Sequence, residues 1–178
     1  MQINRHLLTA AGLLLFLSGS AHAAVAIIEK DANWSADQKE SDHEFKCPTD
    51  KVLVGRSHDG DENGTTKYLC ATVKQNGPLK TFNEESITFE HDESGLCPSN
   101  KLLTGRGRKG DENSDYWIYC SEVRDVWGED SLVRHLSEVL HEKESDHKLE
   151  CSESGVLYAM HHSRDENGPT YYFCAKLF

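Results

Sequence analysis

The stretch Gly60-Asp61-Glu62-Asn63-Gly64 occurs three times in the chain with small changes. The second copy is Gly110-Asp111-Glu112-Asn113-Ser114, and the third is Arg164-Asp165-Glu166-Asn167-Gly168. In every copy the aspartate follows one cysteine by 14 residues and precedes another by 9. Three segments of 24 residues therefore align without a gap, which indicates an internal triplication. The cysteines that bound the segments are Cys47 and Cys70, Cys97 and Cys120, and Cys151 and Cys174.

The residues on either side of each stretch are rich in branched and aromatic side chains and alternate in polarity, which is typical of β-strands. In the first unit these are Lys51 to His58 and Thr66 to Val73. The stretch between them is predicted to be a hairpin turn, with Asn or Gly supplying a positive φ. This turn is much nearer to Cys70 than to Cys47, so the two cysteines cannot lie opposite each other in the hairpin. We therefore expect an earlier strand, from about Ser41 to Cys47, beside or beneath the Thr66 to Val73 strand.

With one more strand upstream, each unit has about four strands, and the sequence predicts an all-β fold. The three repeats cover about 24–77, 78–126 and 127–178 of a single domain. We expect pseudo-threefold symmetry of the β-prism kind, because each disulfide-tied hairpin is expected to be self-contained. A β-trefoil is the alternative, and a linear solenoid is the third choice.

Small residues occupy one equivalent position in each repeat, which is expected where three units crowd an axis or where backbones approach closely. They are Gly55, Gly105 and Ala159, and the neighbouring equivalent leucines are predicted core residues. The segment Ser131 to Lys143 is ambiguous. Its apolar residues have helical spacing, but its end aligns with the strand entry of the first repeat.

The N-terminal residues 1–23 have the pattern of a secretory signal peptide. Arg5 gives the charged start, Leu13 to Leu17 the apolar run, and Ala21-His22-Ala23 the cleavage site. The predicted mature domain is 24–178, secreted or periplasmic, with no later transmembrane segment. Six cysteines in an exported chain favour disulfides, and the repeat favours one bridge in each unit. The expected pairs are Cys47–Cys70, Cys97–Cys120 and Cys151–Cys174.

The chain is acidic, with a formal net charge of −11. Nucleic acids and anionic membranes are bound through cationic contacts, so neither is an expected partner.

The stretch from Asp59 to Gly64 matches the first half of a calcium-binding loop. The position of the bidentate glutamate, however, is taken by Cys70, and the other two copies begin with Lys109 and Ser163. A plain turn is therefore favoured over calcium, and no metal or cofactor is predicted.

Each turn brings a basic and an acidic residue together at a hairpin end. One interpretation is a set of weak surface ion pairs. The other is a polar ligand site used up to three times, as lectins do for sugars, with stacking faces from Tyr68, Trp117 and Tyr172. The candidate ligand-binding residues are His58, Glu62, Arg108, Glu112, His162 and Glu166.

Residues unique to one repeat are the candidates for catalysis, and they gather in the third. They are Arg134, His135, His141, His161 and His162. Adjacent residues of a strand point to opposite faces, which weakens His161 and His162 as a pair of metal ligands. The chain contains no G-x-S-x-G, H-E-x-x-H or Cys–His nucleophile pattern. The prediction is a protein that is not an enzyme.

The repeat cores resemble the dermatopontin family at Phe45-Lys46-Cys47-Pro48, Val52, Arg56-Ser57 and Tyr68-Leu69-Cys70. Asp-Glu-Asn-Gly stands in place of that family's Asp-Arg-x-Trp stretch. Members of the family are extracellular matrix-binding or haemagglutinin-like proteins, so the resemblance implies binding rather than catalysis.

The resulting hypothesis is an exported, disulfide-stabilised binding protein, lectin-like, for glycans or another cell-surface ligand. The alternative is a secreted or periplasmic inhibitor or immunity protein for one partner enzyme or toxin. It would use an asymmetric surface such as Asp130 to Lys143.

Overall fold

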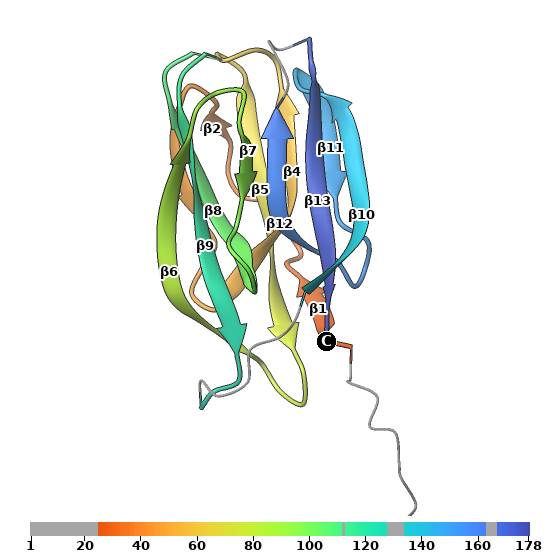
Figure 1. Ribbon diagram of the computed structural model, residues 1–178. Coiled ribbons are helices and arrows are strands. Elements are labelled where there is room, and N and C mark those ends of the chain that lie inside the picture. The colour runs from red at the N-terminus through yellow and green to blue at the C-terminus, as the bar shows by residue number, and fades with distance from the viewer. Residues whose placement is uncertain (1–24, 112, 128–133, 163–166) are drawn as a thin grey trace, which may run out of the picture.

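The computed structural model describes residues 25–111, 113–127, 134–162 and 167–178, and in these ranges the chain is built from strands alone (Figure 1). The all-β prediction is confirmed. The predicted signal peptide, residues 1–23, lies outside the described residues. Within those ranges, no helix has the length and hydrophobicity that crossing a membrane requires.

Thirteen strands are present in the described ranges, and each repeat contains a long hairpin. The hairpins are β4–β5, β8–β9 and β12–β13, all antiparallel. The first repeat has β1 (Ile27–Lys30), β2 (Gln38–Lys39), β3 (Asp42–Lys46), β4 (Lys51–Asp59) and β5 (Thr65–Lys74). The second has β6 (Lys80–Phe89), β7 (Ser94–Leu96), β8 (Lys101–Lys109) and β9 (Tyr116–Arg124). The third has β10 (Arg134–Lys143), β11 (Asp146–Glu150), β12 (Val156–His162) and β13 (Pro169–Leu177).

The ambiguous segment before β11 is a strand in its described part, because Arg134–Lys143 forms β10 and pairs with β13. A helix there would have left the outer edge of β13 unpaired. Residues 131–133 of the same segment lie outside the described residues.

The Asp-Glu-Asn-Gly stretch forms the expected turn, but its positive φ angles come before the aspartate. Gly60 has φ 102° and Gly110 has φ 119°, a region that glycine enters without steric cost. Asn63 instead donates its backbone N–H to the Asp61 side chain at 2.8 Å, as Asp turns commonly allow.

Each repeat is closed by its own disulfide, as the repeat spacing predicted. The three bonds are Cys47–Cys70, Cys97–Cys120 and Cys151–Cys174.

The repeats are not self-contained, however, and that expectation was wrong. The short strand of each repeat pairs with the hairpin of another: β3 with β8, β7 with β12, and β11 with β4. The strand before Cys47 therefore does not pair beside β5. β2 lies between β3 and β5 in the same sheet, and the Phe45 ring of β3 stacks on Tyr68 of β5 with centroids 4.6 Å apart.

Pairing with the exchanged strands explains why glycine occupies two of the three equivalent small positions, Gly55 and Gly105. A Cβ at Gly55 would lie 2.8 Å from the Leu149 carbonyl of β11, and one at Gly105 would lie 2.4 Å from the Phe45 carbonyl of β3. Both distances are too short for a side chain, so the prediction of close backbone approach is confirmed at these positions.

The strands bury two apolar clusters. One contains Val52, Val54, Leu69 and Leu102. The other contains the three equivalent leucines and the disulfide cysteines, and it lies next to a buried polar region. The leucines are Leu53, Leu103 and Leu157.

Candidate functional site

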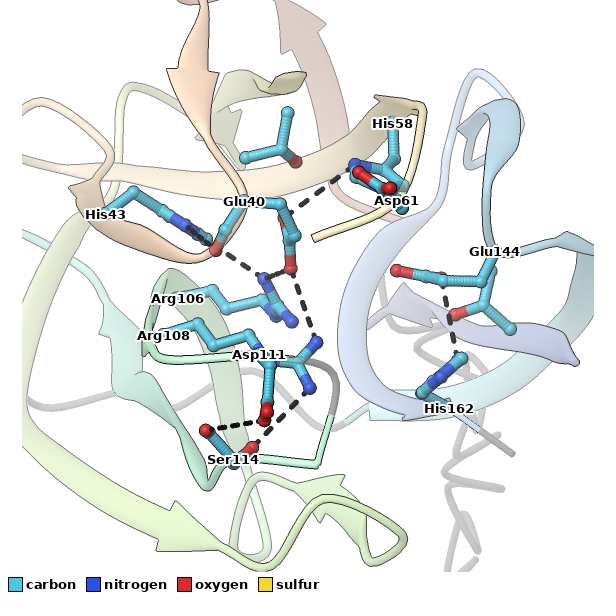
Figure 2. A network of polar contacts seen from close by, with 12 residues as sticks. Glu40, His43, His58, Asp61, Arg106, Arg108, Asp111, Ser114, Glu144 and His162 are labelled. Atoms are coloured by element: carbon cyan, nitrogen blue, oxygen red, sulfur yellow. Dashed lines mark hydrogen bonds and ion pairs between the residues drawn. The ribbon is translucent and has the colours of Figure 1, made fainter. Parts of the chain in front are cut away.

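Two glutamates and two arginines form a buried ion network near the hairpin turns, and Figure 2 shows Glu40, Glu144 and Arg106 of this network. Glu40, in the turn between β2 and β3, lies 2.9 Å from Arg56 of β4 and 2.7 Å from Arg106 of β8. Glu144, in the turn between β10 and β11, lies 2.9 Å from the other side of Arg56. The Arg56 guanidinium therefore bridges two carboxylates that come from different repeats.

The repeated turn positions these carboxylates. The backbone N–H groups of Glu40 and Ser41 donate to the Gly64 and Glu62 carbonyls, each at 3.0 Å. The Glu144 N–H makes the equivalent bond to Gly168 at 3.0 Å. The Asp-Glu-Asn-Gly stretch thus supplies acceptors that fix the Glu40 and Glu144 turns, which is an architectural role.

Two buried histidines flank the carboxylates in matching settings. His43 Nδ1 lies 2.9 Å from the Glu40 carbonyl, and its Nε2 lies 2.7 Å from the Tyr68 hydroxyl. A carbonyl only accepts, so Nδ1 carries the proton and Nε2 accepts from Tyr68. His147 repeats the arrangement with Tyr172 at 2.9 Å.

Burial and a nearby arginine keep both of these histidines neutral. Burial and Arg106 lower the pKa of His43 to about 4, and burial and Arg56 do the same for His147. Neutral imidazoles in this region avoid adding positive charge beside the buried guanidinium groups.

The carboxylates are ionised despite their burial. Burial opposes ionisation of Glu40, but Arg106 and Arg56 hold its pKa well below the ordinary value. Burial likewise opposes ionisation of Glu144, and Arg56 and His147 lower its pKa to about 2. A carboxylate held this strongly in its charged form is poorly suited to act as a general acid or base near neutral pH. The network is suited to holding strands from different repeats together.

The predicted ligand residues His58, Arg108 and His162 all point into this network. His58 Nδ1 lies 3.8 Å and an Arg108 guanidinium nitrogen 3.7 Å from Glu40, and His162 Nδ1 lies 3.8 Å from Glu144. His58 and Arg108 are buried, and His162 is mostly so.

The turn glutamates do not join the network in the described ranges. Glu62 is half-buried in its turn and accepts a hydrogen bond from the Asn63 side chain at 2.8 Å. Glu112 and Glu166 lie outside the described residues. The expected surface pairing of His58 with Glu62 is replaced by the buried contact with Glu40, and a ligand role for these residues stays a prediction.

The three aromatic residues expected to offer stacking faces lie differently. Tyr68 and Tyr172 are each 1% exposed and direct their hydroxyls to histidines. Trp117 is half-buried, and its Nε1 donates to the Tyr119 hydroxyl at 3.1 Å.

Glu138, Cys151 and Cys174 bring potential metal ligands together, within 4.8 Å of one another. The two cysteines form a disulfide, so this group offers no thiolate to a metal ion.

An exposed groove that was not predicted from the sequence is formed by the loop after β5 and the residues after β9. It has a volume of about 310 Å³. Figure 1 draws both loops at the lower end of the molecule, away from the hairpin turns.

Trp127 is 81% exposed, the largest exposure among the big apolar side chains of the described ranges. One sequence signal was available, because Trp127 lies at the junction between two repeats, outside any predicted strand whose core would bury an indole. The groove is lined by Gln75, Asn76, Gly77, Pro78, Leu79, Asp125, Val126 and Trp127.

The chain matches no protein family model, and comparisons with curated proteins and with solved structures found no match either.

Proposed function

We propose that the protein is an exported, non-enzymatic binding protein for glycans or another cell-surface ligand, and that it binds this ligand in the Trp127 groove. Three disulfides fit an extracellular or periplasmic protein. The observation that carries the proposal is an 81% exposed indole beside a groove of about 310 Å³.

The groove combines the two kinds of surface that a sugar presents. Trp127, Val126 and Pro78 offer apolar area to the flat C–H face of a pyranose ring, whereas Gln75 and Asn76 offer amides to its hydroxyl groups. Exposed tryptophans are enriched in binding hot spots because they bury much area with few rotatable bonds. The volume is at the low end of the range for small-molecule sites, which suits roughly one or two sugar rings.

We also propose that the three repeats are related by a pseudo-threefold axis in a prism-like arrangement, with the trefoil as the alternative. The closed cycle of exchanged strands supports the proposal, because each repeat gives one strand and receives one. Superposing the three repeats of a crystal structure would test it.

The binding proposal is tested on a glycan array with the mature protein and its Trp127→Ala variant. We expect the variant to lose the glycans that the wild type binds, while its circular dichroism and unfolding midpoint stay unchanged, because an exposed indole contributes little to the core. Leu136→Ala is the matched control, since it truncates a 60% exposed apolar side chain on β10. If Trp127→Ala binds like the wild type, the groove is not the site.

A protein inhibitor or immunity protein is the second candidate, and β10 is the observation that favours it. This strand is at the edge of the four-stranded sheet and exposes Leu136 by 60% and Val139 by 45%. An exposed edge can pair with a strand of another protein. A one-to-one complex in a pull-down, lost in Val139→Lys and kept in Trp127→Ala, would favour this candidate over the glycan-binding one.

A further inference from the structure

The chain contains three Asn-Gly pairs, and the structure places them in different settings. They are Asn63-Gly64, Asn76-Gly77 and Asn167-Gly168. The first and the third belong to the repeated turns. The second lies in the loop after β5 and forms part of the Trp127 groove. Because the chemistry of the pair is the same in each case, its surroundings decide which pair can react.

An asparagine that precedes a glycine can lose its side-chain amide without an enzyme or a cofactor. The glycine backbone nitrogen attacks the asparagine Cγ and forms a new C–N bond. The bond from Cγ to the side-chain nitrogen breaks, this nitrogen takes up the proton of the glycine amide and leaves as ammonia, and a five-membered succinimide ring remains. Water then opens the ring at one of its two carbonyl carbons and gives aspartate or isoaspartate. Glycine favours the attack because it has no Cβ to crowd the nitrogen.

Both reacting groups of Asn63 are held by hydrogen bonds. Its side-chain amide donates to Glu62 at 2.8 Å, and the Gly64 N–H donates to the Asp61 carbonyl at 2.8 Å. The turn also packs tightly, since a Cβ at Gly64 would overlap the Asp59 carbonyl. The attack would have to break these bonds and distort the turn, so the fold protects Asn63.

The third pair is held in a comparable way. Gly168 is buried, and its carbonyl accepts the Glu144 N–H at 3.0 Å. Asn167 has contacts of its own as well. Rotation of this backbone would disturb the turn that positions Glu144, so the third pair is also constrained.

Asn76-Gly77 lacks these restraints. Neither the Asn76 side chain nor the Gly77 N–H has a hydrogen-bond partner among the described residues, and both residues are exposed. The bond that closes this turn runs from the Gln75 N–H to the Gly77 carbonyl at 2.9 Å, which leaves the Gly77 nitrogen free. Apart from its chain neighbours, a Cβ at Gly77 would meet none of the described residues within 4 Å. The nucleophile and the carbon that it attacks are therefore both accessible.

We propose that Asn76 is a site of spontaneous deamidation, which turns the asparagine amide in the Trp127 groove into a carboxylate. The regulatory part of this inference rests on the proposed binding function, because it needs the groove to be the ligand site. An asparagine amide both donates and accepts hydrogen bonds, whereas a carboxylate only accepts. Asp125 already lines the groove. The reaction places a second carboxylate there, removes a donor to sugar hydroxyls and so weakens glycan binding as the protein ages.

The isoaspartate product also changes the shape of the groove. Its main chain runs through the former side-chain carbon, so the turn becomes one atom longer. The base of this turn is closed by the Lys74–Pro78 bridge and by the Leu79 N–H, which donates to the Val73 carbonyl at 2.9 Å. A longer turn above this base shifts the wall of the groove that faces Trp127.

Peptide mass spectrometry of the mature protein tests the modification. The folded protein is kept near neutral pH, and samples are digested rapidly with pepsin at acid pH, where deamidation is slow. The exchange of the amide for a carboxylate changes the mass of the peptide that carries it. We expect Asn76 to react roughly ten times as fast as Asn63 or faster, because two hydrogen bonds oppose the reaction at Asn63. Equal rates at the two sites would overturn the proposal.

The unfolded protein is the control for the effect of the fold. In guanidinium chloride, with the disulfides reduced and alkylated, the two asparagines lose their different surroundings and should react at similar rates. A large difference that persists in the unfolded chain would come from the local sequence and would reject the structural assignment. Asn76→Gln is the matched variant, because its longer side chain would have to close a six-membered ring, which forms slowly. Its reaction at this position should disappear.

Binding to the glycan array tests the regulatory part. Asn76→Asp reproduces the aspartate product, and Asn63→Asp is its matched control, since it adds the same charge at a hairpin turn away from the groove (Figure 1). We expect Asn76→Asp to bind the glycans roughly fivefold more weakly than Asn63→Asp, which corresponds to the loss of about one hydrogen bond. Equal binding by the two variants would reject the regulatory part.

The proposed function and the deamidation of Asn76 can fail separately. If neither the wild type nor a variant binds a glycan, the proposed function is wrong and the regulatory part with it, while the mass measurement still decides whether Asn76 reacts. If Asn76 stays intact while the wild type binds and Trp127→Ala does not, the groove is the ligand site and the proposed modification is wrong.

Discussion

The carboxylate of Glu40 lies 2.7 Å from the guanidinium of Arg106, although 66 positions separate the two residues in the chain. Both side chains are buried, at 2% and 5% exposed. Arg106 belongs to the second repeat and Glu40 to the turn that begins the exchanged strand β3. This buried ion pair therefore links the first repeat to the second beside the exchanged strand β3.

The substitution Glu40→Gln should destabilise the protein strongly. It keeps the side-chain shape but leaves Arg56 and Arg106 without the charge that both contact. Breaking one side of a buried ion network lowers the free energy of unfolding by about 3–5 kcal/mol. Urea unfolding followed by tryptophan fluorescence measures the change.

Glu90→Gln is the control for this experiment, because Glu90 has the same place in its repeat and is exposed. Its expected effect is within about 0.5 kcal/mol. Equal losses in the two variants would show that burial of the Glu40 network does not contribute to stability.

The buried histidines predict that stability falls as the pH drops from about 6.5 to about 4. His43 and His147 have pKa values of about 4 in the folded protein, against an ordinary value of 6.5. Between these values the unfolded chain binds protons that the folded chain does not, so acid favours unfolding. Each histidine accounts for up to about 3 kcal/mol, and the loss is complete below the folded pKa.

Unfolding in urea at pH 7.5, 5.5 and 4.0 measures this slope. Glu144 extends the loss to lower pH, because its pKa of about 2 lies below the ordinary 4.5. A variant with His43→Gln and His147→Gln should have a shallower slope between pH 6.5 and 4. His135→Gln, on the exposed part of β10, should leave the slope unchanged. An identical slope in the double variant would exclude these two residues as its source.

The disulfides and the hairpins were predictable because the sequence features that determine them lie close together within each repeat. The distance from Cys47 to Cys70 recurs in the other repeats, and the turn between them has a distinct composition. The partner of each short strand was not predictable, since a strand such as Asp42–Lys46 has the same alternating pattern whichever hairpin it pairs with.

The buried ion network was missed for a related reason. Glutamate and arginine are rarely buried, so the presence of Glu40 and Arg56 in the sequence does not by itself predict a buried ion network. One signal was available. Glu40-Ser41-Asp42-His43 is repeated letter for letter at Glu144-Ser145-Asp146-His147, while the second repeat diverges at the same place. Such identity in a polar segment indicates a structural requirement beyond solubility.

Each disulfide should stabilise the fold separately. Replacing both cysteines of one pair with alanine removes a cross-link and so increases the conformational entropy of the unfolded chain. This change should lower the free energy of unfolding by about 2–5 kcal/mol. Three double variants, at Cys47 and Cys70, Cys97 and Cys120, and Cys151 and Cys174, can be compared by urea unfolding without reductant. A variant as stable as the wild type would show that its bridge is not formed in solution.

The substitution Gly105→Ala tests the strand exchange directly. A Cβ at this position would lie 2.4 Å from the Phe45 carbonyl, which belongs to the exchanged strand β3. The strand has to move away from β8, and overpacking of this kind lowers the free energy of unfolding by about 1–3 kcal/mol. The Cys47 amide, which donates to the Thr104 carbonyl at 2.8 Å, should lose protection in hydrogen exchange.

The reciprocal change, Ala159→Gly in the third repeat, adds no atom and should lower the free energy by only about 0.5–1 kcal/mol through backbone entropy. If Gly105→Ala costs no more than Ala159→Gly and the Cys47 amide stays protected, then β3 does not pair with β8 in solution.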